Sequence, residues 1–221
     1  MRSTDPAVRG RRAMLRAAAA WPLLPVFEAL AAGRVDKGIY RVRGEVRING
    51  APAVQGAELK AGDLVVTGTP GELLFVSGSD AFLVREGSRV ELGGQAGQLL
   101  VTGFRIVTGA VLSVFATGQP KQIRTPTATV GIRGTGVYVE IEPGRSYVCT
   151  CYGTADLEAA ADPARYRETV TARHHDEPRY IYAAGELMMA KAPVLNHTDD
   201  ELRMLEGLVG RNPPFGPRTT Y

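Results

Sequence analysis

The sequence predicts an all-β protein of many short strands, followed by one C-terminal helix. Between residues 38 and 159 short apolar alternations recur about every 8–12 residues, separated by glycine, proline, asparagine and aspartate. No amphipathic pattern of three helical turns occurs in this region. Such spacing is typical of a sandwich, barrel or β-roll and not of βαβ units. We expect a stacked, solenoid-like β-roll, with a β-sandwich as the alternative.

The candidate strands alternate with turn residues along this region. They are Gly38–Ile48, Leu64–Thr67, Glu72–Val76, Ala81–Val84, Arg89–Leu92, Gln98–Val101, Phe104–Val107, Ala110–Phe115, Lys121–Arg124, Ala128–Ile132, Val137–Ile141, Ser146–Cys151 and Thr154–Ala159. Asp162–Pro178 is polar and charged, so we expect a surface excursion or irregular arm there. Arg179–Ala183 and Glu186–Ala190 have the pattern of one further hairpin.

The tail predicts a helix over residues 198–209. Thr198 and Glu201 have the spacing of a capping box, and acidic residues in the first turn favourably meet the positive end of the helix dipole. Gly210 is suited to the C-terminal cap. The apolar residues at helical spacing are Leu202, Leu205 and Val209. We expect this helix to cover an open end of the β domain.

The first 31 residues have the pattern of a twin-arginine export signal. Arg11 and Arg12 precede an apolar segment from Ala17 to Phe27, and Ala29-Leu30-Ala31 matches an A-x-A cleavage site. The apolar segment is shorter than the roughly 18 residues that cross a bilayer, so the mature chain has no predicted transmembrane helix. We expect a periplasmic protein, with residues 1–31 as the signal, 38–160 as the β domain and 161–221 as arm, hairpin and helix.

The apparent basicity of the chain comes from this signal. The whole sequence has 26 basic and 23 acidic residues, and residues 1–31 contain five arginines and two acidic residues. The remainder therefore has 21 of each sign and a formal net charge of zero. A neutral protein has no long-range field to hold a polyanion, so we do not expect nucleic-acid binding.

The segment from Ile123 to Val139 joins two alternating stretches that differ in register. Small or apolar residues occupy even positions before Gly134 and odd positions after Gly136. Because strand periodicity is two, this change requires an extra residue, a bulge or a tight turn, and glycine permits such a backbone. Pro126 lacks an N–H, so it marks a strand start or an edge.

This segment resembles the signature of the FecR domain, the periplasmic module of ferric-citrate-type signalling regulators. The matching residues are Thr125, Pro126, Ala128, Val130, Arg133, Gly134, Thr135, Val137 and Val139, with Gly136 after the threonine. A second stretch, Gly44 to Gly50 and Gly56 to Gly68, is similar to the opening of the same domain. The two stretches occur in the family's order, and the resemblance covers about residues 38–158.

The resemblance implies a role in envelope signalling or sensing through a protein partner. Members of the family usually combine a cytoplasmic anti-sigma segment and one membrane helix with a periplasmic domain that receives a signal from an outer-membrane transporter. This sequence has a cleavable-looking export signal and no anti-sigma region, which puts direct sigma-factor control in doubt. We expect a free, non-catalytic module that binds an envelope protein through strand edges and loops.

No sequence pattern indicates an enzyme. The three histidines all lie outside the predicted β domain, and neither a G-x-S-x-G elbow nor a P-loop occurs. Gly134-Thr135-Gly136 lacks the third glycine and the following helix of a dinucleotide site. We therefore predict no catalytic residues.

An alternative function is metal binding or thiol-redox sensing by Cys149, Cys151, His174 and His175. In a strand both thiols point to the same face, about 7 Å apart at Cα, which is marginal for a disulfide. Thiols and imidazoles are ligand types of zinc and copper sites, although C-x-C followed by H-H is not a standard zinc spacing. A disulfide, a metal or redox site and inert thiols all remain open. We expect His197 to be a surface residue before the helix cap.

Overall fold

The computed structural model describes residues 37–99 and 101–216. The predicted export signal, residues 1–31, lies outside this part of the chain. Within it, no helix is long and apolar enough to cross a membrane. The described residues form 14 strands and one helix, which confirms the all-β class and the C-terminal helix.

The strands differ widely in length, from two residues to fifteen. They are β1 (Gly38–Ile48), β2 (Ala51–Pro52), β3 (Leu64–Ser77), β4 (Asp80–Val84), β5 (Arg89–Gly93), β6 (Gly103–Thr108), β7 (Ala110–Val114), β8 (Lys121–Arg124), β9 (Ala128–Ile132), β10 (Gly136–Glu142), β11 (Arg145–Ala159), β12 (Arg167–Ala172), β13 (Arg179–Tyr182) and β14 (Met189–Lys191). The helix α1 spans Asp199–Leu208.

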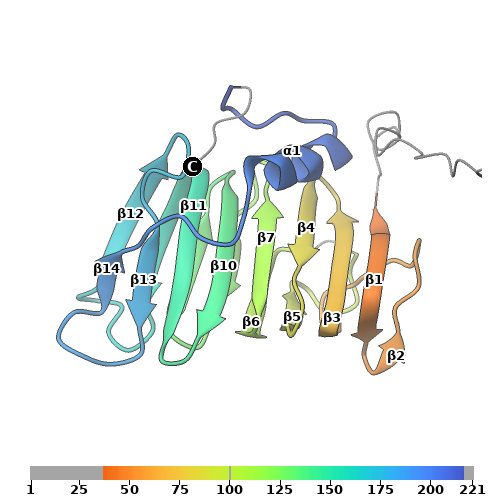
Figure 1. The fold of residues 1–221 in the computed structure, drawn as a ribbon, viewed down its shortest axis with the longest axis horizontal. Helices are drawn as coiled ribbons and strands as arrows, with labels where there is room; N and C mark the ends of the chain where they lie inside the picture. Colours follow the sequence, from red (N-terminus) through yellow and green to blue (C-terminus); the bar gives the residue numbers. More distant parts are fainter. Residues whose placement is uncertain (1–36, 100, 217–221) are drawn as a thin grey trace, which may run out of the picture.

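Nine of these strands close into a barrel, in the order β10-β7-β4-β3-β5-β6-β8-β9-β11. Pairing of β10 with β11 completes the ring (Figure 1). All neighbours in the ring are antiparallel except β6 and β8, which run parallel. β1 lies outside the ring against β3, and β12 and β13 extend from β11. The predictions of a stacked solenoid and of a sandwich are therefore wrong.

The sheet closes into a barrel because β3 and β11 each pair with strands on both sides of it. The predicted strands Leu64–Thr67 and Glu72–Val76 are two ends of β3, which pair with β5 and β4 respectively. At the bend between them, a side chain on Gly71 would meet the Glu45 carbonyl oxygen at 2.5 Å. A bent strand passes from one side to the other and closes the sheet, whereas straight strands would leave it open.

The glycine-rich signature lies at the bend of β11. Strands β9 and β10 both pair with β11, one beyond and one before Gly153, and Gly134 links them with a φ of 80°. A side chain on Gly153, whose φ is 83°, would meet the Gly134 carbonyl oxygen at 2.5 Å. The change of register predicted from the sequence is therefore a corner of the barrel. Gly136 begins β10 at this corner.

The other signature residues support the backbone around this corner. The Thr135 hydroxyl donates to the Thr154 carbonyl oxygen at 2.8 Å, and Arg133 forms an ion pair with Asp156 at 2.7 Å. Before β9, the Thr125 hydroxyl accepts the Ala128 N–H at 2.8 Å. Pro126 occupies the turn between β8 and β9. These contacts are structural ones within a turn and a sheet.

Two apolar layers pack on the two faces of the strands β4 and β7, which are buried along their whole length. The inner layer fills the barrel and contains Phe82, whose ring contacts those of Phe75, Phe104 and Phe115. The outer layer lies between the barrel and α1. Its residues from α1 and the C-cap are Leu202, Leu205, Leu208 and Val209, and its strand residues include Leu83, Leu112 and Val114.

The helix has the N-terminal and C-terminal caps that its sequence predicts. The Thr198 hydroxyl accepts the Glu201 N–H, and the Glu201 carboxylate accepts the Thr198 N–H, so the capping box is present. Gly210 follows the last turn with a φ of 72°. The helix lies across β4 and β7 (Figure 1).

Two local predictions are wrong. The described residues of Gln98–Val101 are not in a strand; they belong to the loop between β5 and β6. The supposed irregular arm contains β12, which pairs with the second half of β11. Its alternation is weak because β12 is an edge strand with exposed polar side chains on one face, so burial and cross-strand pairing decide its conformation.

A buried ion pair joins two sides of the barrel. Lys121 Nζ lies 2.9 Å from Asp80 Oδ2, and Asp80 also accepts the Ala116 N–H at 2.8 Å. Burial raises the pKa of Asp80, against the opposing effects of Lys121 and the Ala116 amide. Because the folded protein binds the Asp80 proton more tightly than the unfolded chain does, the raised pKa stabilises the fold at low pH. This stabilisation is complete below the pKa of Asp80 in the unfolded chain and is lost as the pH rises through its pKa in the folded protein.

We expect Lys121→Met to lower the free energy of unfolding by about 3–5 kcal/mol near about pH 7, because it leaves a buried carboxylate without its cation. The loss should shrink near about pH 4, where Asp80 can take up a proton. Adding Asp80→Asn should restore part of the stability. Chemical denaturation at both pH values measures all three effects. A Lys121→Met protein as stable as the parent at neutral pH would contradict this account.

Candidate metal centre

Cys149 and Cys151 lie on the outer face of β11. The side chains of a strand alternate between faces, so Val148 joins the inner layer whereas both cysteines join the outer one. Both thiols are fully buried, and neither is in a disulfide. The cysteines thus occupy the layer beneath the C-terminal segment.

Two histidines reach these thiols from later parts of the chain. His175 lies in the loop after β12, with a φ of 55°, and its main-chain N–H donates to the Cys151 carbonyl oxygen at 2.8 Å. His197 directly precedes the N-cap residue Thr198, and its ring stacks on Tyr138 at a centroid distance of 4.6 Å. The two histidines are 3% and 5% exposed. Four buried side chains therefore converge from three segments.

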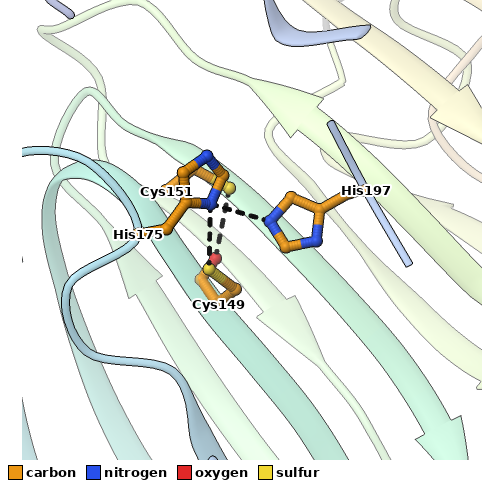
Figure 2. Close-up of side chains that lie close together, drawn as sticks. All are labelled: Cys149, Cys151, His175 and His197. Carbon is orange, nitrogen blue, oxygen red and sulfur yellow. Dashed lines mark hydrogen bonds between the residues drawn. The ribbon is translucent and has the colours of Figure 1, made fainter. Parts of the chain in front are cut away.

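The ligand atoms of Cys149, Cys151, His175 and His197 all lie within 4.8 Å of one another. Figure 2 shows the two imidazoles facing each other beside the thiols. His175 Nδ1 is 3.4 Å from Cys149 Sγ and 2.9 Å from His197 Nε2. Around a tetrahedral zinc ion, neighbouring nitrogens would lie about 3.4 Å apart, and nitrogen and sulfur about 3.6 Å apart. The two measured separations that involve His175 Nδ1 are therefore within about half an ångström of those in a tetrahedral site.

The outer nitrogen of each ring faces an acceptor. His197 Nδ1 lies 2.6 Å from the Leu195 carbonyl oxygen, and His175 Nε2 lies 3.3 Å from Asp199 Oδ1. A neutral imidazole has one N–H, so donation from His197 Nδ1 to the Leu195 carbonyl oxygen leaves His197 Nε2 with a lone pair directed at His175. His175 Nδ1 can donate a proton to this lone pair, and a metal ion that displaces the proton would have both nitrogens as ligands. Such outer partners also orient histidines in metal sites.

The electrostatics favour one thiolate. Burial opposes ionisation of Cys149, but hydrogen bonds with Cys151, His175 and His197 outweigh it and hold the pKa of Cys149 well below its usual value. Burial and the contact with Cys149 raise the pKa of Cys151. Thiolate is the form that ligates metals, so the site is prepared to bind a cation.

The structure brings together only three of the four residues proposed from the sequence. His174 lies outside the group of four; its Nε2 contacts Asp199 Oδ1 at 2.9 Å. The prediction that His197 is a surface residue is wrong, because the chain returns it to β11 before α1 begins. Sequence spacing gave no sign of this, since the return follows from packing of the helix on the barrel.

Comparisons with known proteins give little further guidance. No protein-family model matches the sequence, and no curated protein matches it. Two crystal structures of a candidate anti-sigma factor from Parabacteroides distasonis are similar, each at 12% identity. Their TM-scores are 0.45 and 0.40, over 58% and 66% of this chain. The matches span 58% and 59% of those chains, less than two thirds, and scores this low support no functional conclusion.

We expect Asp199→Asn to weaken Zn²⁺ binding about 10–100-fold, because it removes the negative charge that lies 3.3 Å from His175 Nε2. The control is Asp200→Asn, in the same helical turn but with a side chain 64% exposed. Competition with a chromogenic chelator measures both affinities. Equal affinities for the two variants would exclude a positioning role for Asp199.

Proposed function

We propose that the protein is a non-catalytic domain that binds one Zn²⁺ through Cys149, Cys151, His175 and His197. The observation that carries this proposal is the convergence of four buried ligand atoms within 4.8 Å. Two sulfur and two nitrogen ligands in a tetrahedral arrangement suit zinc better than other common divalent ions. Copper(I), which also favours thiolates, is the alternative ion.

The proposed site is closed, which argues for a structural or sensory role. Catalytic zinc sites usually have three protein ligands and keep one position for water or substrate. Here four protein ligands are available, and all four side chains are buried beneath the C-terminal segment. This arrangement supports a domain without enzymatic activity.

The proposed cellular setting rests on the sequence. The twin-arginine pattern favours export to the periplasm, and that route carries folded proteins. A metal inserted before export would therefore remain in place. Together with the FecR resemblance, these features favour a metal-containing envelope protein in sensing or signalling.

We expect the purified protein to contain about one zinc ion per chain by elemental analysis. Cys149→Ser and His197→Ala should lose the metal. Thr150→Val is the matched control, because Thr150 lies between the cysteines and its hydroxyl is buried without a hydrogen-bond partner. A metal-free parent, or a Cys149→Ser protein with the parent's metal content, would refute the site. One copper per chain would refute zinc but keep the ligands.

A second candidate function is partner binding by strand addition, as the FecR resemblance suggests. Among the described residues, β12 pairs only with β11 and β14 only with β13. Tyr182 and Met188 form a backbone hydrogen bond, as do Ala192 and Pro178. Because bonded and non-bonded pairs alternate in antiparallel strands, the N–H of Lys191 turns away from β13. This edge can accept another strand.

We expect Lys191→Pro to abolish co-purification of an envelope partner while leaving thermal unfolding nearly unchanged. Proline removes an N–H that points to the free edge and breaks no bond to β13. Lys191→Ala, which keeps the N–H, is the control. Retention of the partner by the proline variant, in pull-downs from the native envelope, would show that β14 is not the binding edge.

A further inference from the structure

We propose that zinc binding controls the attachment of α1 to the barrel, an inference that rests on the proposed zinc site. With zinc bound, the helix lies over β4 and β7 as observed. Without zinc, the N-terminal end of the helix detaches and uncovers the apolar outer face of these strands. The metal site is thus a regulatory latch as well as a structural feature.

The ligands lie on both sides of the junction between barrel and helix. Cys149 and Cys151 belong to β11, a strand of the closed ring. His197 belongs to the segment that enters α1 and is adjacent to its N-cap. Asp199, in the first turn, contacts His175. One ion bound by all four ligands therefore connects the ring directly to the first turn of the helix.

Several other attachments at this end are polar and partly solvated, in addition to the stacking of His197 on the buried Tyr138. Arg85 forms an ion pair with Glu201 at 2.8 Å, with side chains 26% and 24% exposed. Arg85 also donates to the Asn196 carbonyl oxygen, and the Asn196 amide donates to Glu140. Partly exposed ion pairs contribute little to stability, because water and salt screen them. The metal would add a link at this end that joins the ring to the segment entering the helix.

The C-terminal end of the helix has separate anchors. Arg211 Nε donates to the buried Glu206 carboxylate at 2.6 Å, and Arg211 also donates to the Ser79 carbonyl oxygen. The Tyr152 hydroxyl donates to Glu206. None of these contacts involves the four metal ligands. Loss of zinc therefore leaves this end attached, and the helix can pivot on it.

Two opposing effects set the balance in the metal-free protein. Burial of Leu202, Leu205 and Leu208 against the barrel favours attachment. The two thiols and two imidazoles hydrogen-bond with one another, but their desolvation in an apolar layer without a cation opposes it. Zinc removes the opposition. Detachment separates His197 from the cysteines, so only the attached state has all four ligands, and zinc shifts the population toward it.

Hydrogen exchange of the full chain, zinc-loaded and after chelation, tests the proposal. Elemental analysis of each sample first establishes its metal content. We expect amides of residues 202–205, at the N-terminal end, to exchange at least about tenfold faster in the metal-free sample, while amides of β6, β8 and β9 on the far side of the barrel keep their protection. Binding of an apolar fluorescent dye should rise in parallel.

Two variants separate the metal from the other contacts. In His197→Ala, exchange of the helix should be fast whether or not zinc is added. Arg85→Ala removes the ion pair at the same end but no ligand, so its helix should still gain about tenfold protection on adding zinc. Slowing of helix exchange by zinc in His197→Ala would overturn the latch.

The remaining outcomes are distinct. Stoichiometric zinc with unchanged helix exchange would overturn the latch and leave the zinc site intact. Equal loss of protection in α1 and in the far strands would also overturn it, because zinc would then be a folding cofactor for the whole domain. A protein that takes up no zinc would refute the proposed function itself, and the latch with it.

Discussion

The bent strand β11 pairs with four other strands, and the closure of the barrel depends on it. Its first half pairs with β10 and β13, and its second half pairs with β9 and β12. The bend is at Gly153, where the backbone passes so close to Gly134 that no side chain fits between them. Because both halves belong to one continuous strand, the pairings on the two sides of the barrel hold each other in register.

This geometry also sets the environment of the cysteines. The residues of β11 before the bend have one face in the barrel and the other beneath the C-terminal segment. Cys149 and Cys151 are on the second face, so their burial depends on α1 and on the segment before it. The helix in turn needs the apolar outer face of β4 and β7. The outer layer is therefore formed jointly by the middle and the end of the chain.

A polar cluster inside an apolar layer is costly unless its groups are satisfied. Here the outer nitrogens of both imidazoles face acceptors, while the inner nitrogens and the thiols face one another. The polar groups are thus directed toward a common centre. The strand edges proposed for partner binding extend from the same β11, so metal binding and partner contact would share one element of the fold.

Local patterns in the sequence are enough to predict most strands and the helix. Alternation and turn residues give β8 and β9 with their observed bounds, and Thr198 with Glu201 gives the start of α1. These features depend on neighbouring residues, whose spacing is visible in the chain. Closure of the barrel is not visible in this way, because it depends on which distant strands pair across the bends of β3 and β11.

The same distinction between local sequence pattern and long-range packing applies to the candidate site. The two thiols can be assigned to one face of a strand from their spacing, and thiols with histidines suggest a metal. Which histidines take part is a tertiary matter: His175 and His197 are 22 residues apart and meet only because α1 packs on the barrel. Adjacent His174 and His175 both contact Asp199, but only the ring of His175 also reaches Cys149. Long-range packing, which the chain's local pattern does not encode, decides the ligand set.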